Sequence, residues 1–303
     1  MMIAVMGAAG RVGSQVAALL LREGASIRVL EHRRPLVTLR QRGAEVVIGT
    51  ALDDEALLAL FTGVSAALVL LPEDLADPRF VANRSRMSRA IVSALREARV
   101  PHVVALSSVG ADRADTVGPP AGLREFERHL FALDEANVLA LRSAFYMDNL
   151  LANLPLIQAQ RINGSAIRGD LRFPMVATQD VAREATARLL CRDFAEHRVK
   201  LLLGPEDVSM QEATSLIGEL LDFPDLPYIQ FPPAGVKDAL RAAGMSDEVA
   251  SLLVDMQLAL NQGRPFTGVH RTVESTTPTR LVDFLRGALS ERWARPAATG
   301  GSE

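Results

Sequence analysis

The sequence predicts an α/β protein built on a Rossmann-type, doubly wound parallel sheet, with a smaller and mostly helical C-terminal substrate lobe. Three observations support this fold class. A glycine-rich loop follows an apolar run at the N-terminus, short apolar runs then alternate with segments of helical periodicity, and the 303 residues are 49% hydrophobic. Strands that are apolar throughout belong in a parallel sheet covered on both faces, and right-handed crossovers then wind that sheet doubly.

Six strands and the helices between them are expected in the first half of the chain. The strands are short apolar runs, and the helices show apolar spacing of about 3.6 residues. The expected strands cover residues 2–7, 26–31, 44–49, 65–71, 102–108 and 137–142. The expected helices cover residues 11–24, 35–43, 53–63 and 79–100. Gly24 is a suitable C-cap for the first helix, and Asp53 and Asp54 open the third.

The loop after the first strand has a G-x-x-G-x-x-G spacing, formed by Gly7, Gly10 and Gly13. The tight turn needs a residue that tolerates unusual backbone angles, and a pyrophosphate needs a backbone with no Cβ in the way. The third glycine lets helix and strand approach closely, and the helix N-terminus offers free N–H groups to phosphate. Because the loop joins a strand to a helix, it predicts dinucleotide binding; the alternative is a glycine turn without a ligand.

The end of the second strand bears on the choice between NAD and NADP. Glu31 lies 18 residues after Gly13, near the position where an acid binds the ribose 2′-OH of NAD and repels a 2′-phosphate. Arg33 and Arg34 would pair with that phosphate, unless they are solvated or rest on the adenine. The balance favours NAD slightly, because Glu31 stands at the strand end itself.

The second half of the chain has a different pattern. Its helix-like segments are residues 145–160, 179–191, 209–221, 234–262 and 278–289, and its short strands lie near 173–176, 199–203 and 227–231. We therefore expect an NAD(P)-binding Rossmann domain at 1–144, a substrate-binding lobe at 145–291 with some segments returning to the sheet, and a flexible tail at 292–303.

Composition argues against several classes of function. A net charge of −3 and a pI of about 6.0 give no basic excess for nucleic acid, and no apolar run approaches the ~18 residues of a membrane span. The single cysteine, Cys191, permits no internal disulfide and fits the cytoplasm. The five histidines have no metal-ligand spacing, so we expect no metal. We expect the protein to bind a small aromatic substrate, and whether it forms a homodimer stays open.

Seven stretches have an order and spacing that is typical of one family. They are "GAAGRVG", "RGAEVVIGTALDDEALLALFTGVSAALVLLP", "VPHVVALSSVGAD", "LRSAFYMDNLL", "MVATQDVAREATARLL", "LLLGPEDVSMQEATSLI" and "TPTRLVDFL". With them the chain resembles, over nearly its full length, the NmrA-like family of atypical short-chain dehydrogenase/reductase relatives. That family includes NAD(P)H-dependent quinone, azo-dye and triphenylmethane reductases and redox-sensing regulators.

The resemblance implies a role for individual residues. Those that would bind the pyrophosphate are Gly7, Ala9, Gly10, Arg11, Val12 and Gly13. Those that would line the adenosine and ribose path are Leu70, Leu71 and Pro72. Ser107 and Ser108 would lie near the nicotinamide, and Phe145, Tyr146 and Asn149 at the junction of cofactor and substrate.

The chain departs from this pattern at two positions, and it also lacks a common catalytic pair. Thr50 stands where the family often has an acid near the adenine, and Arg124 stands on or beside a position where many relatives keep a lysine. An arginine stays protonated, so it orients groups or stabilises charge but relays no proton. The two tyrosines and two lysines never give the Tyr-x-x-x-Lys spacing of ordinary ketone reductases.

The candidate catalytic residues are therefore Ser107, Arg124 and His129, the last on the helix expected to face the site, although a packed or solvated histidine is the alternative. A quinone delocalises the charge formed on reduction, so positioning and exclusion of water can supply most of the rate. The leading hypothesis is an NAD(P)H-dependent oxidoreductase that transfers hydride to a flat conjugated acceptor, a quinone or an aromatic polyketide. The alternatives are a non-catalytic NAD(P)-sensing regulator of a protein partner and a metal- and flavin-free monooxygenase that tailors an aromatic polyketide.

Overall fold

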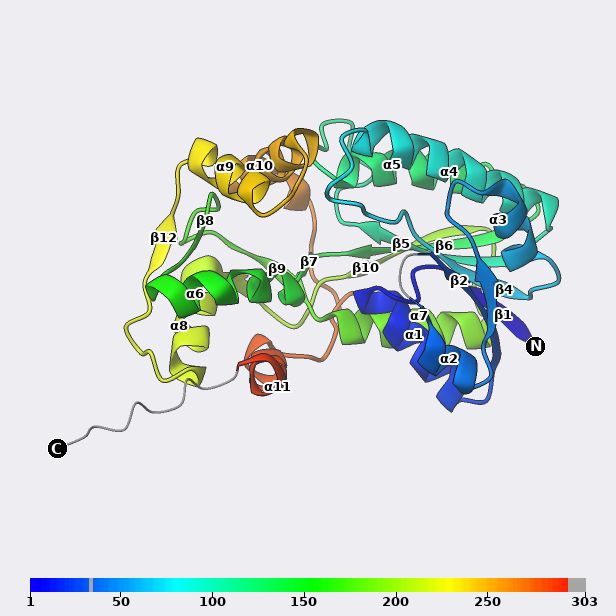
Figure 1. Cartoon of the computed structure of the whole chain (residues 1–303), viewed down its shortest axis with the longest axis horizontal. Coiled ribbons are helices and arrows are strands. Elements are labelled where there is room, and N and C mark those ends of the chain that lie inside the picture. The colour runs from blue at the N-terminus through cyan, green and yellow to red at the C-terminus, as the bar shows by residue number, and fades with distance from the viewer. Residues whose placement is uncertain (33–34, 294–303) are drawn as a thin grey trace.

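The computed structural model describes residues 1–32 and 35–293 and contains a seven-stranded parallel sheet with helices on both faces (Figure 1). The strand order is β3-β2-β1-β4-β5-β6-β10, as expected for a doubly wound Rossmann-type sheet. The strands are β1 (Met2–Val5), β2 (Ser26–Glu31), β3 (Glu45–Ile48), β4 (Ala66–Val69), β5 (His102–Ser108), β6 (Asn137–Ser143) and β10 (His197–Leu202). The predicted fold class is confirmed.

Two apolar cores hold the helices against this sheet. One contains side chains of α1 (Arg11–Arg22), α2 (Val37–Gln41) and α7 (Thr178–Cys191). The other, on the opposite face, contains side chains of α3 (Asp54–Phe61), α4 (Phe80–Glu97) and α5 (Pro120–Leu130). The four central strands are almost wholly buried, which explains their continuous apolar sequence.

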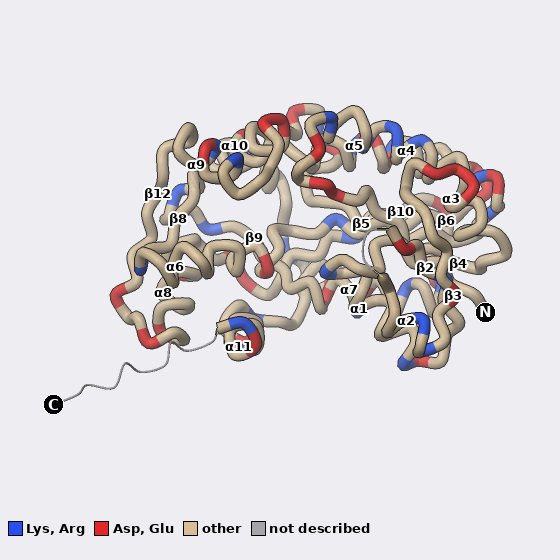
Figure 2. The backbone as a smooth tube through the Cα atoms, in the orientation of Figure 1, with Lys and Arg blue, Asp and Glu red and all other residues tan. Residues whose placement is uncertain are grey.

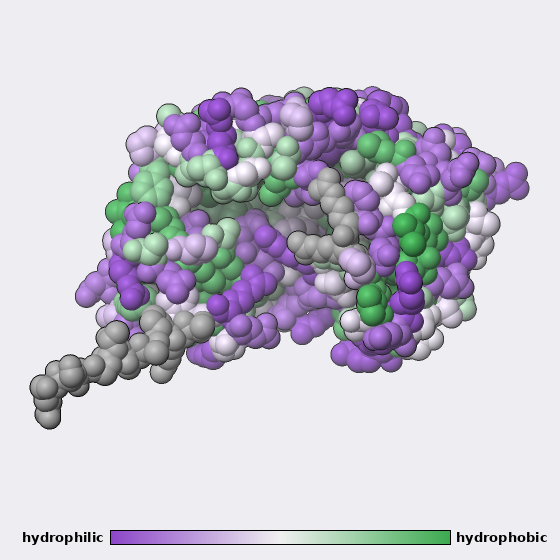
Figure 3. Space-filling model, viewed as in Figure 1, coloured by the Kyte–Doolittle hydropathy of each residue, from purple (hydrophilic) through white to green (hydrophobic). Residues whose placement is uncertain are grey.

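The C-terminal lobe has its own core and two small sheets. One sheet joins β7 (Phe145–Tyr146), β9 (Arg172–Val176) and β11 (Asp207–Ser209); the other pairs β8 (Asn163–Ser165) with β12 (Tyr228–Gln230). The helices are η1 (Met147–Asn153), α6 (Leu154–Gln160), α8 (Met210–Leu220), α9 (Pro233–Ala242), α10 (Asp247–Asn261), η2 (Arg264–Phe266) and α11 (Leu281–Arg292). Figure 3 shows a hollow on this face, between the lobe and the main sheet.

Several boundaries in this half differ from the prediction. The strand expected at 199–203 is β10, which returns to the main sheet beside β6, and α7 packs against α1. The helix expected at 145–160 begins as β7 and a 3₁₀ segment, and the one expected at 234–262 is divided around Gly244, whose φ is +92°. Strands β8 and β11 were not predicted, because each has only three residues, too few to give a periodic signal.

Charged residues of both signs lie along the outer helices in the view of Figure 2. Helices α5 and α9 carry both basic and acidic residues, α4 carries mainly arginines, and α3 and α10 carry acidic residues alone. The net charge of −3 is therefore not the remainder of two large patches of opposite sign on this view.

Candidate dinucleotide and substrate site

The glycine loop at the carboxyl end of β1 forms a cradle that only glycine fits. Gly7 has φ +67°, and a Cβ there would stand 2.6 Å from Cδ2 of Leu70. A Cβ on Gly13 would overlap the carbonyl oxygen of Gly7, so this glycine lets α1 start against the end of β1. The Gly10 N–H donates to the Gly7 carbonyl at 2.8 Å and closes the turn. The three glycines therefore have the separate roles that a dinucleotide loop requires.

The start of α1 is open to a ligand. Gly10 is its N-cap, and among the described residues no side chain caps this end. Ala9, Gly10 and Arg11 are exposed, whereas Val12 is buried in the core. The first N–H groups of the helix are unpaired within it and lie at the positive end of its dipole. The cradle and the uncapped helix thus fit a pyrophosphate.

The second lobe is fastened to this loop by side-chain hydrogen bonds. Arg11 Nη1 donates to Asn149 Oδ1 at 2.9 Å. Gln15 Nε2 donates to Thr178 Oγ1 at 3.2 Å, and Thr178 Oγ1 donates to Asp148 Oδ1 at 3.0 Å. These contacts join α1, η1 and the first residue of α7. They bring Asn149, predicted at the cofactor–substrate junction, into contact with Arg11, predicted to bind pyrophosphate.

Tyr146 lies next to this junction. Burial raises the pKa of its phenol above the ordinary value, and Glu73 and Asp148 act in the same direction, whereas the Ser143 hydroxyl and Arg11 act to lower it. The phenol therefore stays neutral at physiological pH. The Asp148 carboxylate accepts from the hydroxyl of Thr178 and so supports the start of α7.

Ser107 belongs to a buried polar network. Its Oγ donates to Glu127 Oε1 at 2.5 Å, and Arg142 donates to both oxygens of Glu127, at 3.0 and 2.6 Å. Arg142 Nη1 also lies 3.2 Å from Asp112 Oδ2 in the loop after β5. Burial acts to lower the pKa of Arg142, but its bonds to Glu127 and Asp112 raise it above the ordinary value. The Ser107 hydroxyl is thus held toward α5, while Ser108 Oγ donates to the neighbouring Val109 carbonyl at 3.1 Å.

The structure does not bring the other candidate catalytic residues to one place. His129 lies in the last turn of α5, and its Nδ1 is 2.8 Å from Ser88 Oγ of α4. The start of α5 follows the carboxyl end of β5, so this last turn is remote from the glycine loop. Arg124 is half-buried in the second turn of α5 and makes no hydrogen bond or ion pair with the described residues. Their catalytic roles stay predictions.

On the predicted adenosine side of the site, Glu31 and Thr50 already accept hydrogen bonds from the protein backbone. Glu31 Oε2 accepts from the Leu36 N–H at 2.6 Å and lies 3.7 Å from Arg40 Nη2. Thr50 Oγ1 accepts from the Leu52 N–H at 3.0 Å in the turn before α3. Leu70 contacts the loop through Gly7, Leu71 is buried in the core and Pro72 is half-buried. Arg33 and Arg34 lie outside the described residues.

Two charged groups at the site were not predicted from the sequence. Glu73 directly follows Pro72 and acts electrostatically on Tyr146. Its Oε1 lies 3.2 Å from Nη1 of Arg84, which is only 4% exposed on α4. An acid four residues after a buried strand, beyond the carboxyl edge of the sheet, was the signal that could have identified Glu73.

Between residues 1–32 and 35–293, no group of three or more His, Cys, Asp or Glu is arranged to hold a metal ion. Within those ranges no helix has the length and apolarity needed to cross a membrane.

The fold and the loop define a Rossmann-type α/β protein with a dinucleotide cradle. The model of the NmrA-like family matches residues 1–282, and the chain belongs to that family. It is similar to the (4-alkanoyl-5-oxo-2,5-dihydrofuran-3-yl)methyl phosphate reductase of Streptomyces griseus, with 31% identity over 81% of each chain. The NAD(P)H azoreductase of Xenophilus azovorans is 24% identical, over 98% of this chain and 100% of the relative.

A solved structure has the same fold. The NADPH complex of the NADPH-dependent quinone oxidoreductase of Escherichia coli superposes with a TM-score of 0.78. The match covers 95% of this chain and 100% of that one, at 21% identity. The overall arrangement of sheet and lobe is therefore shared with that enzyme.

Proposed function

We propose that the protein is an NAD(P)H-dependent reductase whose acceptor is a flat conjugated molecule, such as a quinone or an aromatic polyketide. The observation that carries this proposal is the glycine cradle fastened through Arg11 to Asn149 and lying next to Tyr146. Two similar proteins and one structural neighbour support it, because their names give a furanone, an azo compound and a quinone as acceptors. All three acceptors are conjugated.

Different residues of the chain would bind the dinucleotide and orient the acceptor. The first-turn N–H groups of α1 and the side chain of Arg11 would hold the pyrophosphate over the Cβ-free surface of Gly7 and Gly13. When bound, the nicotinamide dinucleotide supplies the hydride, so that NAD(P)H, a proton and a quinone become NAD(P)⁺ and a hydroquinone. Tyr146 and Asn149 would orient the acceptor, with the neutral Tyr146 phenol as a hydrogen-bond donor.

The absence of a Tyr-x-x-x-Lys pair fits such an acceptor. Ser107 already donates to Glu127, so its hydroxyl proton is engaged by a buried carboxylate. An acceptor that spreads negative charge over a conjugated system needs no strong acid in the site, because the anion formed by hydride transfer can take its proton from the solvent afterwards. Orientation and exclusion of water then supply most of the rate.

A spectrophotometric assay tests the proposal. The protein is mixed with NADH or NADPH and a panel containing a benzoquinone, a naphthoquinone, an azo dye and an alkanoyl furanone. We expect nucleotide oxidation in proportion to enzyme concentration with at least one acceptor. Tight nucleotide binding without any oxidation above background would instead indicate the sensing function, and oxygen uptake with a polycyclic substrate would indicate oxygenation.

Glu31 is expected to favour NADH over NADPH, because its carboxylate would repel a 2′-phosphate at the end of β2. Replacing it in the Glu31→Gln variant removes the charge and keeps the shape. We expect the ratio of the Kd for NADPH to that for NADH to fall about tenfold, which corresponds to ~1.4 kcal/mol. Fluorescence titration of both nucleotides measures it. A wild-type preference for NADPH of tenfold or more would contradict the assignment.

Single substitutions test whether a side chain supplies the proton. The variants Arg124→Met and His129→Ala each remove one candidate group. We expect kcat for a quinone to stay within about tenfold of the wild type for Arg124→Met and His129→Ala, less than the 10²–10⁴-fold of a general acid. A larger loss in either, with an altered pH profile, would place an acid there after all.

One further proposal comes from the sequence alone: a cytoplasmic location, because the single cysteine permits no internal disulfide. Whether the protein forms a homodimer stays open, and sedimentation velocity would decide it.

A further inference from the structure

Two serines lie side by side at the carboxyl edge of the main sheet, on the face that carries α1. Ser108 ends β5, Ser143 ends β6, and the register of the two strands pairs these residues. Because side chains alternate along a strand, Ser143 shares a face with Leu141, which packs in the same core as α1 and α7. Ser107 and Arg142, one residue earlier in each strand, point to the opposite face and α5. The paired serines therefore lie on the side of the sheet where the glycine loop begins α1.

The hydroxyl of Ser143 is buried and has no hydrogen-bond partner among the described residues. Ser143 is only 3% exposed, and a buried hydroxyl without a partner destabilises a folded protein. Ser108 differs, because it is half-buried and its Oγ donates to the Val109 carbonyl at 3.1 Å. An unpaired donor at the end of a well-packed strand calls for a role other than stability.

Tyr146 brings a third hydroxyl to the same place. It follows Ser143 by three residues, in β7, and its ring packs against the core on the α1 face. In Figure 1 β7 lies where the main sheet meets the lobe. The Ser143 hydroxyl acts to lower the pKa of this phenol, although the two groups form no hydrogen bond of ordinary geometry. Hydrogen bonds at reactive sites commonly tighten when a substrate binds, so Ser143 is placed to donate to the phenol oxygen.

The surroundings of Tyr146 keep its phenol protonated and able to donate. Burial raises the pKa of the phenol, Glu73 and Asp148 add to this, and together they outweigh Ser143 and Arg11. A hydrogen bond from a serine to the phenol oxygen strengthens the phenol as a donor, because hydrogen bonds in a chain polarise one another. Such a chain stabilises negative charge that develops on an oxygen atom in front of it.

We propose that Ser143 is a positioning residue for Tyr146, and that the Tyr146 phenol donates a hydrogen bond to a carbonyl oxygen of the acceptor. This inference rests on the proposed reductase function and narrows the acceptor to conjugated carbonyl compounds, such as quinones and enones. A hydride, which is a proton with two electrons, converts a quinone to the hydroquinone monoanion, whose charge lies largely on oxygen. The hydrogen bond from Tyr146 stabilises this anion, which takes its second proton from the solvent afterwards.

Steady-state kinetics with 1,4-naphthoquinone test both roles. Ser143→Ala and Tyr146→Phe are each expected to lower kcat about tenfold or more, because each weakens the hydrogen bond to the developing charge. The double variant should be no slower than Tyr146→Phe alone, since Ser143 acts through the phenol. Ser143→Ala should leave the urea midpoint unchanged or raise it, because the hydroxyl that it removes has no partner to lose. A kcat within about threefold of the wild type, or a lower midpoint that marks a structural role, would overturn the inference.

Two matched variants remove comparable hydroxyls elsewhere in the fold. Thr186 of α7 is 6% exposed and its Oγ1 also lacks a partner among the described residues, so Thr186→Val is the control for Ser143→Ala. The Tyr228 phenol donates to the Ile167 carbonyl at 2.7 Å in the lobe, so Tyr228→Phe is the control for Tyr146→Phe. Both controls should keep the wild-type kcat, and Tyr228→Phe should lower the urea midpoint.

Binding of 4-nitrophenol in the presence of NAD⁺ or NADP⁺, read from the absorbance of the phenolate, requires no turnover. We expect the phenolate to bind at least tenfold more tightly than the neutral phenol, and Ser143→Ala and Tyr146→Phe to remove most of this preference. Binding without a preference, no binding, or a preference that both variants keep would overturn the inference, and quinone reduction would leave the reductase function standing. Phenolate binding that depends on both hydroxyls, in a protein that oxidises neither nucleotide, would overturn the reductase function and keep the hydroxyl site.

Discussion

Replacing Gly13 by alanine is expected to raise the Kd for the dinucleotide at least 100-fold and to lower the free energy of unfolding by about 1–3 kcal/mol. The new Cβ would overlap the carbonyl oxygen of Gly7 and stand 2.9 Å from that of Met6. Both oxygens belong to the backbone at the buried end of β1, so the added Cβ forces the backbone of the glycine loop to move. Nucleotide titration and urea denaturation of the same variant measure both effects.

A matched control separates this clash from the intrinsic effect of adding a methyl group to a helix. Gly287 lies in α11, is exposed, and has no atom within 4 Å of an added Cβ. Gly287→Ala should leave nucleotide binding unchanged and stabilise the protein by up to about 1 kcal/mol, because alanine favours helix over glycine. If Gly13→Ala behaves like Gly287→Ala, the loop does not hold the dinucleotide as proposed.

Replacing Arg142 by methionine is expected to lower the free energy of unfolding by about 3–5 kcal/mol. The change leaves the Glu127 carboxylate, 4% exposed, without its cation. The loop after β5 also loses the ion pair between Arg142 and Asp112, so the surroundings of Ser107 should loosen as well. Urea denaturation followed by circular dichroism gives the value.

A double variant and a solvent-exposed ion pair provide the controls. Arg142→Met combined with Glu127→Gln should be more stable than Arg142→Met alone, because no unpaired charge stays buried. Arg241 is 53% exposed and its Nε lies 3.5 Å from Asp247. Replacing it by methionine should lower the free energy of unfolding by no more than about 1 kcal/mol. Equal costs at Arg142 and Arg241 would show that the buried network contributes no more than a surface pair.

The sheet and the glycine loop were predictable because their signals are local. Gly7, Gly10 and Gly13 lie within one turn and its helix, and each strand of the first half is a continuous apolar run. A short segment whose structure depends on residues far away in the chain could not be predicted in this way. The strand β10 is half exposed at the edge of the sheet, so its sequence does not reveal that it pairs with β6.

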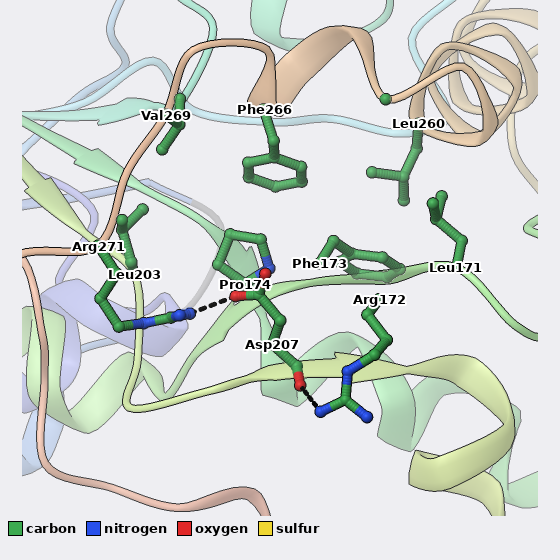
Figure 4. Close-up of a pocket in the computed structure, with 11 residues that line it drawn as sticks. Leu171, Arg172, Phe173, Pro174, Leu203, Asp207, Leu260, Phe266, Val269 and Arg271 are labelled. Atoms are coloured by element: carbon green, nitrogen blue, oxygen red, sulfur yellow. Dashed lines mark hydrogen bonds and ion pairs between the residues drawn. The ribbon is translucent and has the colours of Figure 1, made fainter.

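The environment of Ser107 could have been partly foreseen. Arg142 lies inside a strand that is otherwise apolar, and a charge buried in a sheet requires a partner. Which acid pairs with it depends on how α5 packs, and that packing places Glu127 between Arg142 and Ser107. The small cavity beside β9 could not be predicted from the sequence, because its lining comes from three stretches of the chain, residues 171–174, 203–207 and 260–271 (Figure 4).

We infer that the glycine cradle holds a nicotinamide dinucleotide whose oxidation is coupled to reduction of a conjugated acceptor. The steady-state rate of NADH and NADPH oxidation with a quinone, for the wild type and for folded Gly13→Ala, tests this coupling. We expect enzyme-dependent oxidation by the wild type and a kcat/KM for the nucleotide at least 100-fold lower in the variant. Oxidation of neither nucleotide by the wild type, or equal rates in both proteins, would contradict it.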